Sequence, residues 1–201
     1  MNEHEIQTIL TITRRLAATT ALDELLELIM THSLDLLDAE RASILLYDPA
    51  THELVSRIAT GEEEIRFPAD RGIAGETISG GATINVPDAY ADDRFNPEVD
   101  RTTGFRTRSI LSVPLIDFEG HLVGVLQILN KRTGPFGESD ETLAETLAAQ
   151  AGVSLQRARL MEHYREKLQM EQAMEIAREI QQGLLPKESP AIPDFELAGM
   201  S

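Results

Sequence analysis

The chain has no cysteine and no tryptophan, and aromatic residues make up only 4% of its 201 positions. The absence of cysteine excludes disulfides, thiolate metal sites and cysteine nucleophiles, and it suits a reducing compartment, so we expect a cytoplasmic protein. With so few rings, the core must be mainly aliphatic. No run of about 18 apolar residues occurs and the N-terminus lacks signal-peptide features, so no membrane span or membrane partner is expected.

Positive charge is also scarce. There are 18 Lys and Arg residues against 34 Asp and Glu residues, and the formal net charge is −16. A field of this sign repels nucleic acid and anionic lipid, because both are bound through clustered Lys and Arg, so no nucleic-acid partner is expected. A single small anion is a different case, because backbone N–H groups at a helix N-terminus can hold it even in an acidic protein.

The hydrophobic content of 42% fits one globular core with appendages. Helical spacing predicts an N-terminal helix within residues 1–19 and a second, amphipathic helix after Thr20, which is the expected N-cap. Residues 86–108 are rich in Pro, Asp, Arg and Gly, and predict a long loop that covers a site. Helices before and after a sheet indicate an α+β fold. The strands are expected at 41–48, 53–60, 64–68, 108–117 and 121–131.

A long helix is predicted from an N-cap at Ser139 to about Gln182, with Gly183 and Pro186 ending it. Its apolar residues follow alternating four- and three-residue steps and change phase after Leu168. This pattern is typical of a coiled coil with a local change of winding. We expect residues 159–185 to form a dimeric coiled-coil linker, because one domain cannot cover so long a stripe. The alternative is one long helix folded onto its own sheet.

Five dispersed positions carry a family resemblance within a long co-linear match. The segment Asn85 to Lys131 ends in an Asn-Lys pair, and a Phe and then an Asp-Glu pair follow it. Residues 20–158 thereby resemble a GAF domain of the cyclic-nucleotide-binding kind, as in phosphodiesterases and some adenylyl cyclases. The resemblance implies a six-stranded antiparallel sheet with helices on one face and a ligand pocket on the other. The motif residues are expected to be structural, with an ion pair between Lys131 and Asp140: Asn130, Lys131, Phe136, Asp140 and Glu141.

The expected ligand is a cyclic nucleotide. Spacing alone makes Gly72-Ile73-Ala74-Gly75 an ordinary glycine-rich turn, but its place in the family match indicates that the amides of Ile73 and Ala74 face a phosphate. Neutral side chains at Thr60 and Gln127 suit adenine, so cAMP is favoured over cGMP. The resemblance implies five further ligand-binding positions: Ser43, Asn96, Asp100, Thr103 and Thr107. At the position of Asn96, some relatives have an aromatic hydroxyl.

The last part of the chain carries a second resemblance, to the entry into PPM-type metal-dependent serine/threonine phosphatases of bacterial stress response and sporulation. It implies that residues 186–201 begin a phosphatase domain and that the chain is a piece of a longer bacterial protein. Metal ions, Mn or Mg, are expected only in that missing domain. The matching positions are Ile180-Gln181, Leu184-Leu185-Pro186, Pro190 and Phe195–Ala198.

Three hypotheses about function remain. In the first, the chain is a cyclic-nucleotide sensor that forms a homodimer through its N- and C-terminal helices and regulates the phosphatase. In the second, it is a ligand-free dimerisation or protein-interaction module, in which Phe67 or Phe95 fills the pocket and the Ile73 and Ala74 amides are bonded internally. The third, a complete enzyme, requires a nucleophile or metal cluster. None is evident, because the five histidines are scattered and the paired acids suggest solvated loops, so no catalytic residue and no metal site is expected.

Overall fold

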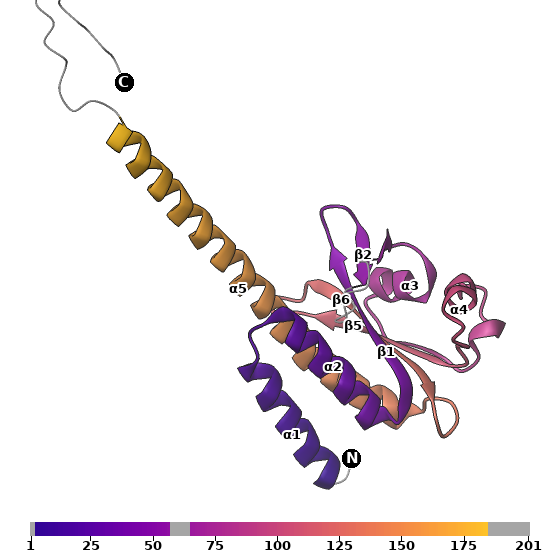
Figure 1. Ribbon diagram of the computed structural model, residues 1–201. Helices are drawn as coiled ribbons and strands as arrows, with labels where there is room; N and C mark the ends of the chain where they lie inside the picture. The colour runs from indigo at the N-terminus through magenta and orange to yellow at the C-terminus, as the bar shows by residue number, and fades with distance from the viewer. Residues whose placement is uncertain (1–2, 57–64, 185–201) are drawn as a thin grey trace, which may run out of the picture. The chain divides into compact units, whose positions relative to one another are not determined.

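The computed structural model describes residues 3–56 and 65–184 (Figure 1). The chain divides into two compact units, residues 1–161 and 162–201. The first unit contains one six-stranded antiparallel sheet with the strand order β3-β2-β1-β6-β5-β4. This is the α+β architecture predicted above. The strands are β1 (Ala39–Asp48), β2 (Glu53–Ser56), β3 (Ile65–Pro68), β4 (Ile84–Val86), β5 (Ile110–Ile116) and β6 (Leu122–Lys131).

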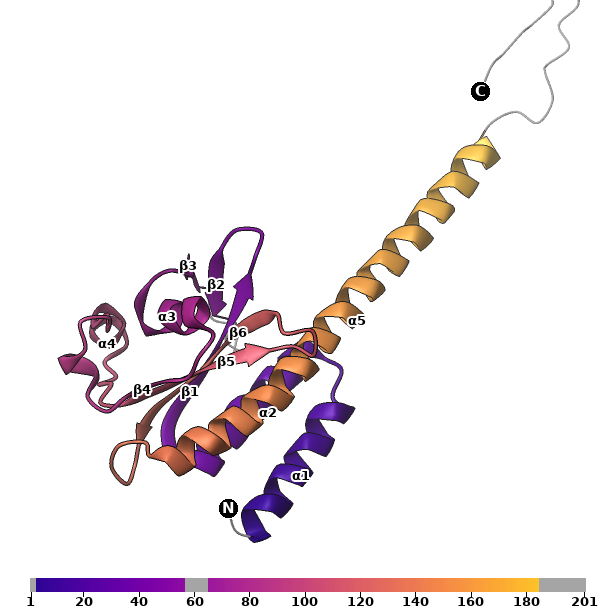
Figure 2. The same ribbon diagram turned by 180° about the vertical axis from the view of Figure 1, so that it is seen from behind.

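Helices α2 (Leu22–Leu37) and the first part of α5 (Glu138–Leu184) lie side by side over one face of the sheet (Figures 1 and 2). Helix α1 (Glu3–Ala18) packs onto this layer through Ile12 and Leu16. Since side chains alternate along a strand, every second strand residue faces these helices and joins the main aliphatic core. Fully buried members of this core include Leu25, Ile29, Leu111, Leu126, Ile128 and Leu155.

The opposite face of the sheet carries short elements: α3 (Gly72–Gly80), the 3-10 turn η1 (Ala89–Ala91) and α4 (Glu98–Thr103). Two smaller apolar clusters attach α3 and η1 to the sheet. Ala74 and Ile78 of α3 pack on Leu45 and Val125, and Ile73 packs with Ile110. The 86–108 segment therefore contains two short helical elements, η1 and α4, within the predicted long connection.

Two predicted helix caps are wrong. The N-cap of α2 is Ala21 and makes no side-chain cap bond, so Thr20 does not have that role. Helix α5 begins at Glu138, ahead of Ser139, and the carboxylate of Asp140 accepts a hydrogen bond from the Gly137 amide at 2.8 Å. An aspartate inside the first turn thus reaches back to the amide that precedes the helix, and this contact differs from the one expected of a serine cap.

The predicted ends of α5 also need correction, because the helix continues through Gly183 to Leu184. A glycine inside a helix costs only about 1 kcal/mol, which does not by itself end one. The short strand β4 was not expected either. Residues 57–60 of the predicted second strand and the phosphatase-like residues 185–201 lie outside the described part of the chain.

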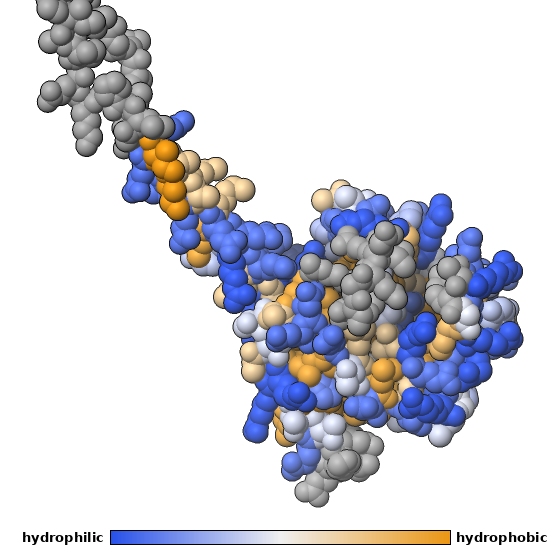
Figure 3. All heavy atoms as spheres, in the orientation of Figure 1, coloured by the Kyte–Doolittle hydropathy of each residue, from blue (hydrophilic) through white to orange (hydrophobic). Residues whose placement is uncertain are grey.

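In the second unit, residues 163–181 of α5 are exposed to solvent. Their large apolar side chains include Tyr164, Met170, Met174, Ile176 and Ile180. Figure 3 shows apolar residues of this helix in orange on its surface. Within residues 3–56 and 65–184, no helix has the length and apolar character needed to cross a membrane.

Candidate functional site

The N-terminus of α3 is the predicted phosphate-binding element. Gly72 has a φ of +68°, which favours glycine, and a Cβ on Gly75 would lie 2.6 Å from the carbonyl carbon of Asp70. The Gly75 amide donates to the Arg71 carbonyl at 3.0 Å. Among the described residues, no group accepts a hydrogen bond from the amides of Ile73 or Ala74. Within the described part of the chain, these two helix-terminal amides therefore have no acceptor, and both residues are buried.

A row of polar side chains crosses the sheet on the same face as α3. In the strand register, Ser43 of β1 and Ser112 of β5 both pair with Gln127 of β6. Gln127 Nε2 donates to Ser112 Oγ at 3.4 Å, and Thr77 of α3 bonds the same oxygen at 2.8 Å. The sheet thus brings the predicted residues Ser43 and Gln127 into register on one face.

Ser112 and Thr77 were missed by sequence reasoning. Both side chains are fully buried. The available signal was a serine inside the otherwise apolar strand Ile110–Ile116, since a buried hydroxyl needs a polar partner.

The segment 86–108 is closed on itself by Asp100. Its buried carboxylate accepts hydrogen bonds from the Thr107 amide and the Thr107 hydroxyl, each at 2.7 Å, and from the Tyr90 hydroxyl at 3.1 Å. Arg106 lies over the Tyr90 ring, 4.6 Å from its centroid. Burial and the contact with Asp100 raise the pKa of Tyr90 above its ordinary value. Asp100 and Thr107, both predicted to line the ligand, bind each other here.

The other predicted site positions are less informative. Asn96 is exposed, and its side-chain oxygen accepts from the Glu98 amide at 3.0 Å. Thr103 is the last residue of α4. Thr60 lies outside the described residues. Asn96 thus has a local turn-forming contact, and the ligand role of all three positions stays a prediction.

Asp92 and Arg94 form the tightest ion pair of this segment. The guanidinium of Arg94 donates two hydrogen bonds to the Asp92 carboxylate, at 2.9 and 2.7 Å, and the Arg94 amide adds a third at 3.0 Å. These contacts lower the pKa of Asp92 to about 2. The Arg94 carbonyl lies 3.6 Å from the position a Cβ on Gly72 would take, so this pair borders the start of α3.

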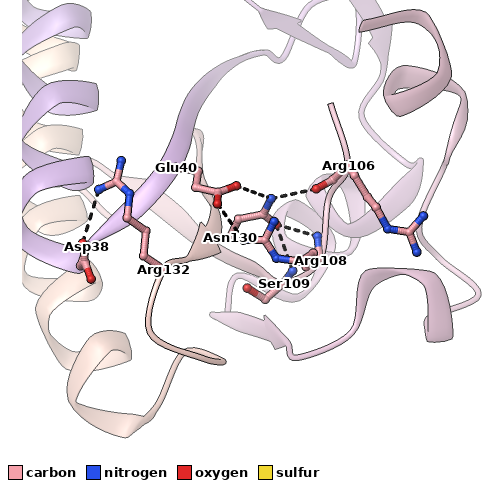
Figure 4. A network of polar contacts seen from close by, with 7 residues as sticks. All are labelled: Asp38, Glu40, Arg106, Arg108, Ser109, Asn130 and Arg132. Carbon is pink, nitrogen blue, oxygen red and sulfur yellow. Dashed lines mark hydrogen bonds and ion pairs between the residues drawn. The ribbon is translucent and has the colours of Figure 1, made fainter. Parts of the chain in front are cut away.

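The signature residue Asn130 lies at the centre of a polar network (Figure 4). It is fully buried with a φ of +57°. Its side-chain oxygen accepts from the amides of Arg108 and Ser109, and its Nδ2 donates to Glu40 and to the Arg106 carbonyl. Hydrogen bonds from Arg108 and Asn130 lower the pKa of Glu40. The end of the 86–108 segment is thereby fastened to β1 and β6.

The remaining signature residues connect the sheet to α5. Lys131 forms an ion pair with Asp140, as the sequence predicted. Phe136 is buried in the main core. Asn85 of β4 donates to the Phe136 carbonyl at 2.9 Å and to the Glu141 carboxylate at 2.7 Å. All of these contacts lie within the scaffold, which agrees with a structural role for the motif.

Taken together, the chain combines an antiparallel sheet, a layer of helices on one of its faces and a row of polar side chains beneath short elements on the other. The GAF domain family model matches residues 21–155, and the chain belongs to this family.

Curated relatives include the probable 3',5'-cyclic phosphodiesterase pde-5 of Caenorhabditis elegans, which is 34% identical over 174 residues, 80% of this chain and 23% of that protein. The dual 3',5'-cyclic-AMP and -GMP phosphodiesterase 11 of Drosophila melanogaster is 37% identical over 121 residues, 59% of this chain and 8% of that protein. The chain thus spans less than a quarter of the length of these relatives.

Solved structures confirm the fold. The GAF domain of an Acinetobacter phosphoenolpyruvate-protein phosphotransferase has a TM-score of 0.67 at 20% identity, covering 81% of this chain and 99% of its own. A free methionine-R-sulfoxide reductase of Neisseria meningitidis, solved with its substrate, has a TM-score of 0.65 at 22% identity, covering 78% of this chain and 91% of its own. At this level of identity the likeness concerns the fold alone.

Proposed function

We propose that this chain is a regulatory, non-catalytic module that binds a cyclic nucleotide between α3, the sheet and the 86–108 segment. The similarity to cyclic phosphodiesterases carries this proposal, because it extends over 80% of the chain at 34% identity. The proposed ligand-binding residues are those named from the sequence: Ser43, Thr60, Ile73, Ala74, Asn96, Asp100, Thr103, Thr107 and Gln127.

The geometry of the described residues supports this assignment at two points. The open amides of Ile73 and Ala74 at the start of α3 suit a singly charged cyclic phosphate. The hydroxyl of Ser43 and the amide of Gln127 lie on neighbouring strands of the same face. A hydroxyl and an amide can meet both the amine donor and the ring acceptor of adenine, so we propose cAMP as the preferred ligand.

The test is a calorimetric titration of this chain with cAMP and with cGMP. We expect heat with cAMP and a weaker affinity for cGMP. Gln127→Leu removes one base-reading hydrogen bond and should weaken cAMP binding about tenfold. Gln172→Leu, at an exposed position of α5, is the matched control and should leave the affinity unchanged. The absence of heat with either nucleotide would contradict the proposal.

A ligand-free interaction module remains the second candidate, because the two phenylalanines named above are already packed. Phe67 contacts the apolar cluster under α3, and Phe95 packs against the cluster that contains Ile73. The Phe95 and Tyr90 rings also lie 5.2 Å apart. If the chain is such a module, neither cAMP nor cGMP binds, whereas the chain still self-associates. The titration, combined with sedimentation analysis, separates the two candidates.

Control of a downstream PPM-type phosphatase is the finer part of the proposal. It is supported by the resemblance of the last segment, of which only Ile180, Gln181 and Leu184 fall in the described helix. Ligand binding would shift the equilibrium between two arrangements of the paired α5 helices toward one of them. The longer protein should hydrolyse phosphoserine peptides with Mn²⁺, at a rate that cAMP changes. A rate unaffected by saturating cAMP would rule out this coupling.

A further inference from the structure

The hairpin between β5 and β6 holds three side chains of the types that ligate metal ions, and the proposed function does not use them: Asp117, Glu119 and His121. The turn is well defined. The Asp117 amide donates to the His121 carbonyl at 2.9 Å, and the Gly120 amide donates to the Asp117 carbonyl at 3.2 Å. Asp117 Oδ1 accepts from the amides of Glu119 and His121, at 2.8 and 2.9 Å. One carboxylate oxygen of Asp117 is therefore committed to the turn.

The second oxygen of Asp117 is different. Oδ2 is buried and has no hydrogen-bond partner among residues 3–56 and 65–184, and the Asp117 side chain has an exposed fraction of 0%. Burial acts to raise the pKa of Asp117, but hydrogen bonds from His121 and Glu119 hold it below the ordinary value. The nearest ion-pairing atom to this oxygen is His121 Nδ1, at 3.4 Å, which is positive only when the imidazole is protonated. With a neutral imidazole the buried oxygen is poorly satisfied, so a positive partner at this position is expected.

The neighbouring ligand atoms surround that oxygen. His121 Nδ1 lies 3.4 Å from Asp117 Oδ2 and 3.4 Å from Glu119 Oε2. All three atoms lie within 4.8 Å of one another. Ligand atoms bound to a tetrahedral zinc ion at roughly 2.1 Å are separated by about 3.4 Å. The two distances to His121 already match this separation, and the exposed Glu119 side chain can adjust the third.

We propose that Asp117, Glu119 and His121 bind one divalent transition-metal ion, with zinc as the best fit. Two carboxylates and a neutral imidazole balance the charge of such an ion. A nitrogen ligand favours zinc or cobalt over magnesium and calcium, which prefer all-oxygen sites. Three protein ligands leave a fourth coordination position for water or for a group from another molecule.

The position of the hairpin separates this site from the nucleotide site. It lies at the opposite end of β5 and β6 from Asn130, and Ile116, next to Asp117, contacts Gly152 of α5. A bound ion would join both ends of the turn and stabilise the place where the sheet meets α5. Metal binding therefore does not depend on the cyclic-nucleotide proposal.

The test uses the full metal-free chain. Calorimetry with Zn²⁺ and visible absorption with Co²⁺ should show one site per chain that His121→Ala weakens at least tenfold. Glu119→Gln should weaken it too. Both residues are exposed, so both variants should fold, which circular dichroism checks. The matched control is His163→Ala, which removes an exposed histidine of α5 and should bind like the wild-type chain.

Three results would overturn the proposal. One is the absence of Zn²⁺ binding by the wild-type chain. Another is equal affinity in the His121→Ala and wild-type chains. The third is a Mg²⁺ affinity as high as that for Zn²⁺, which would indicate only the general attraction of an acidic surface. Nucleotide titrations of the same variants should be unchanged, so failure of one proposal does not imply failure of the other.

Discussion

A single buried side-chain amide, that of Asn130, joins three segments of the GAF domain. It connects β6 to β1 through Glu40 and to residues 106–109 through two backbone amides and one carbonyl. The residue also adopts a left-handed φ of +57°, which asparagine tolerates better than most other side chains. Both properties explain why an asparagine suits the end of β6.

Two substitutions separate these properties. Asn130→Gly keeps the left-handed backbone but loses the side-chain hydrogen bonds, and should lower the free energy of unfolding by about 2–4 kcal/mol. Asn130→Ala also strains the backbone and should cost about 1 kcal/mol more. The measurement is urea denaturation, with the exposed Asn96→Ala as control, expected within about 1 kcal/mol of wild type. A neutral Asn130→Gly variant would show that the network does not stabilise the fold.

For individual residues, the sequence predicts a contact only where a family motif includes both partners. The Lys131–Asp140 pair was predicted because the family signature spans both positions. The contact between Asp100 and Thr107 was not, since both had been assigned to the ligand and no local pattern shows which polar groups satisfy each other. The turn Asp117–His121 has a short Asp-x-Glu-x-His spacing. No metal site is expected from the sequence because the five histidines are scattered, but that expectation does not take into account the acidic residues beside each histidine.

At the scale of single elements, helix α5 approaches the sheet closely at Gly152. A Cβ on Gly152 would lie 2.2 Å from the carbonyl oxygen and 2.7 Å from the amide nitrogen of Ile116. Both neighbours are backbone atoms, so rotation of a side chain cannot relieve the contact. Glycine at this position therefore determines how near the helix axis lies to β5.

Gly152→Ala should consequently lower the free energy of unfolding by about 2–4 kcal/mol, through displacement of α5 from β5. Thermal denaturation followed by circular dichroism measures this. Gly80→Ala is the control, because a Cβ there meets nothing within 4 Å, and its change should stay within about 0.5 kcal/mol. Equal stability of both variants would contradict the predicted close approach.

The long, periodic elements were predictable because burial imposes a regular pattern on them. The helices of the main core and the strands β1, β5 and β6 were predicted to within a few residues. The strand β4 has only three residues, too few to show alternation. The helix caps were wrong because several polar residues near each end compete for the same amides.

At the scale of the whole molecule, the apolar stripe of α5 divides into two parts. Leu147, Ala151 and Ala158 are buried against the sheet domain. Leu168, Met170 and Met174, further along, are exposed within the second unit. The predicted homodimer would cover this second part, because paired helices bury such a stripe without help from the domain.

Sedimentation equilibrium tests the dimer. The double variant Leu168→Glu, Met174→Glu places charges in the proposed interface and should raise the dimer dissociation constant at least tenfold. Gln172→Glu adds one negative charge away from the stripe and should have little effect. A wild-type chain that is monomeric at high micromolar concentration would leave the coiled-coil proposal without support.

Arg157 of α5 has a consequence for how a signal could pass through the domain. Its guanidinium donates hydrogen bonds to the carbonyls of Leu16, Ala17 and Thr19, where α1 ends. Those carbonyls have no partners of their own within the helix. If α5 slid along its axis or rotated, the Arg157 guanidinium would move away from these carbonyls and the hydrogen bonds would break. These bonds therefore couple the movement of α1 to that of α5.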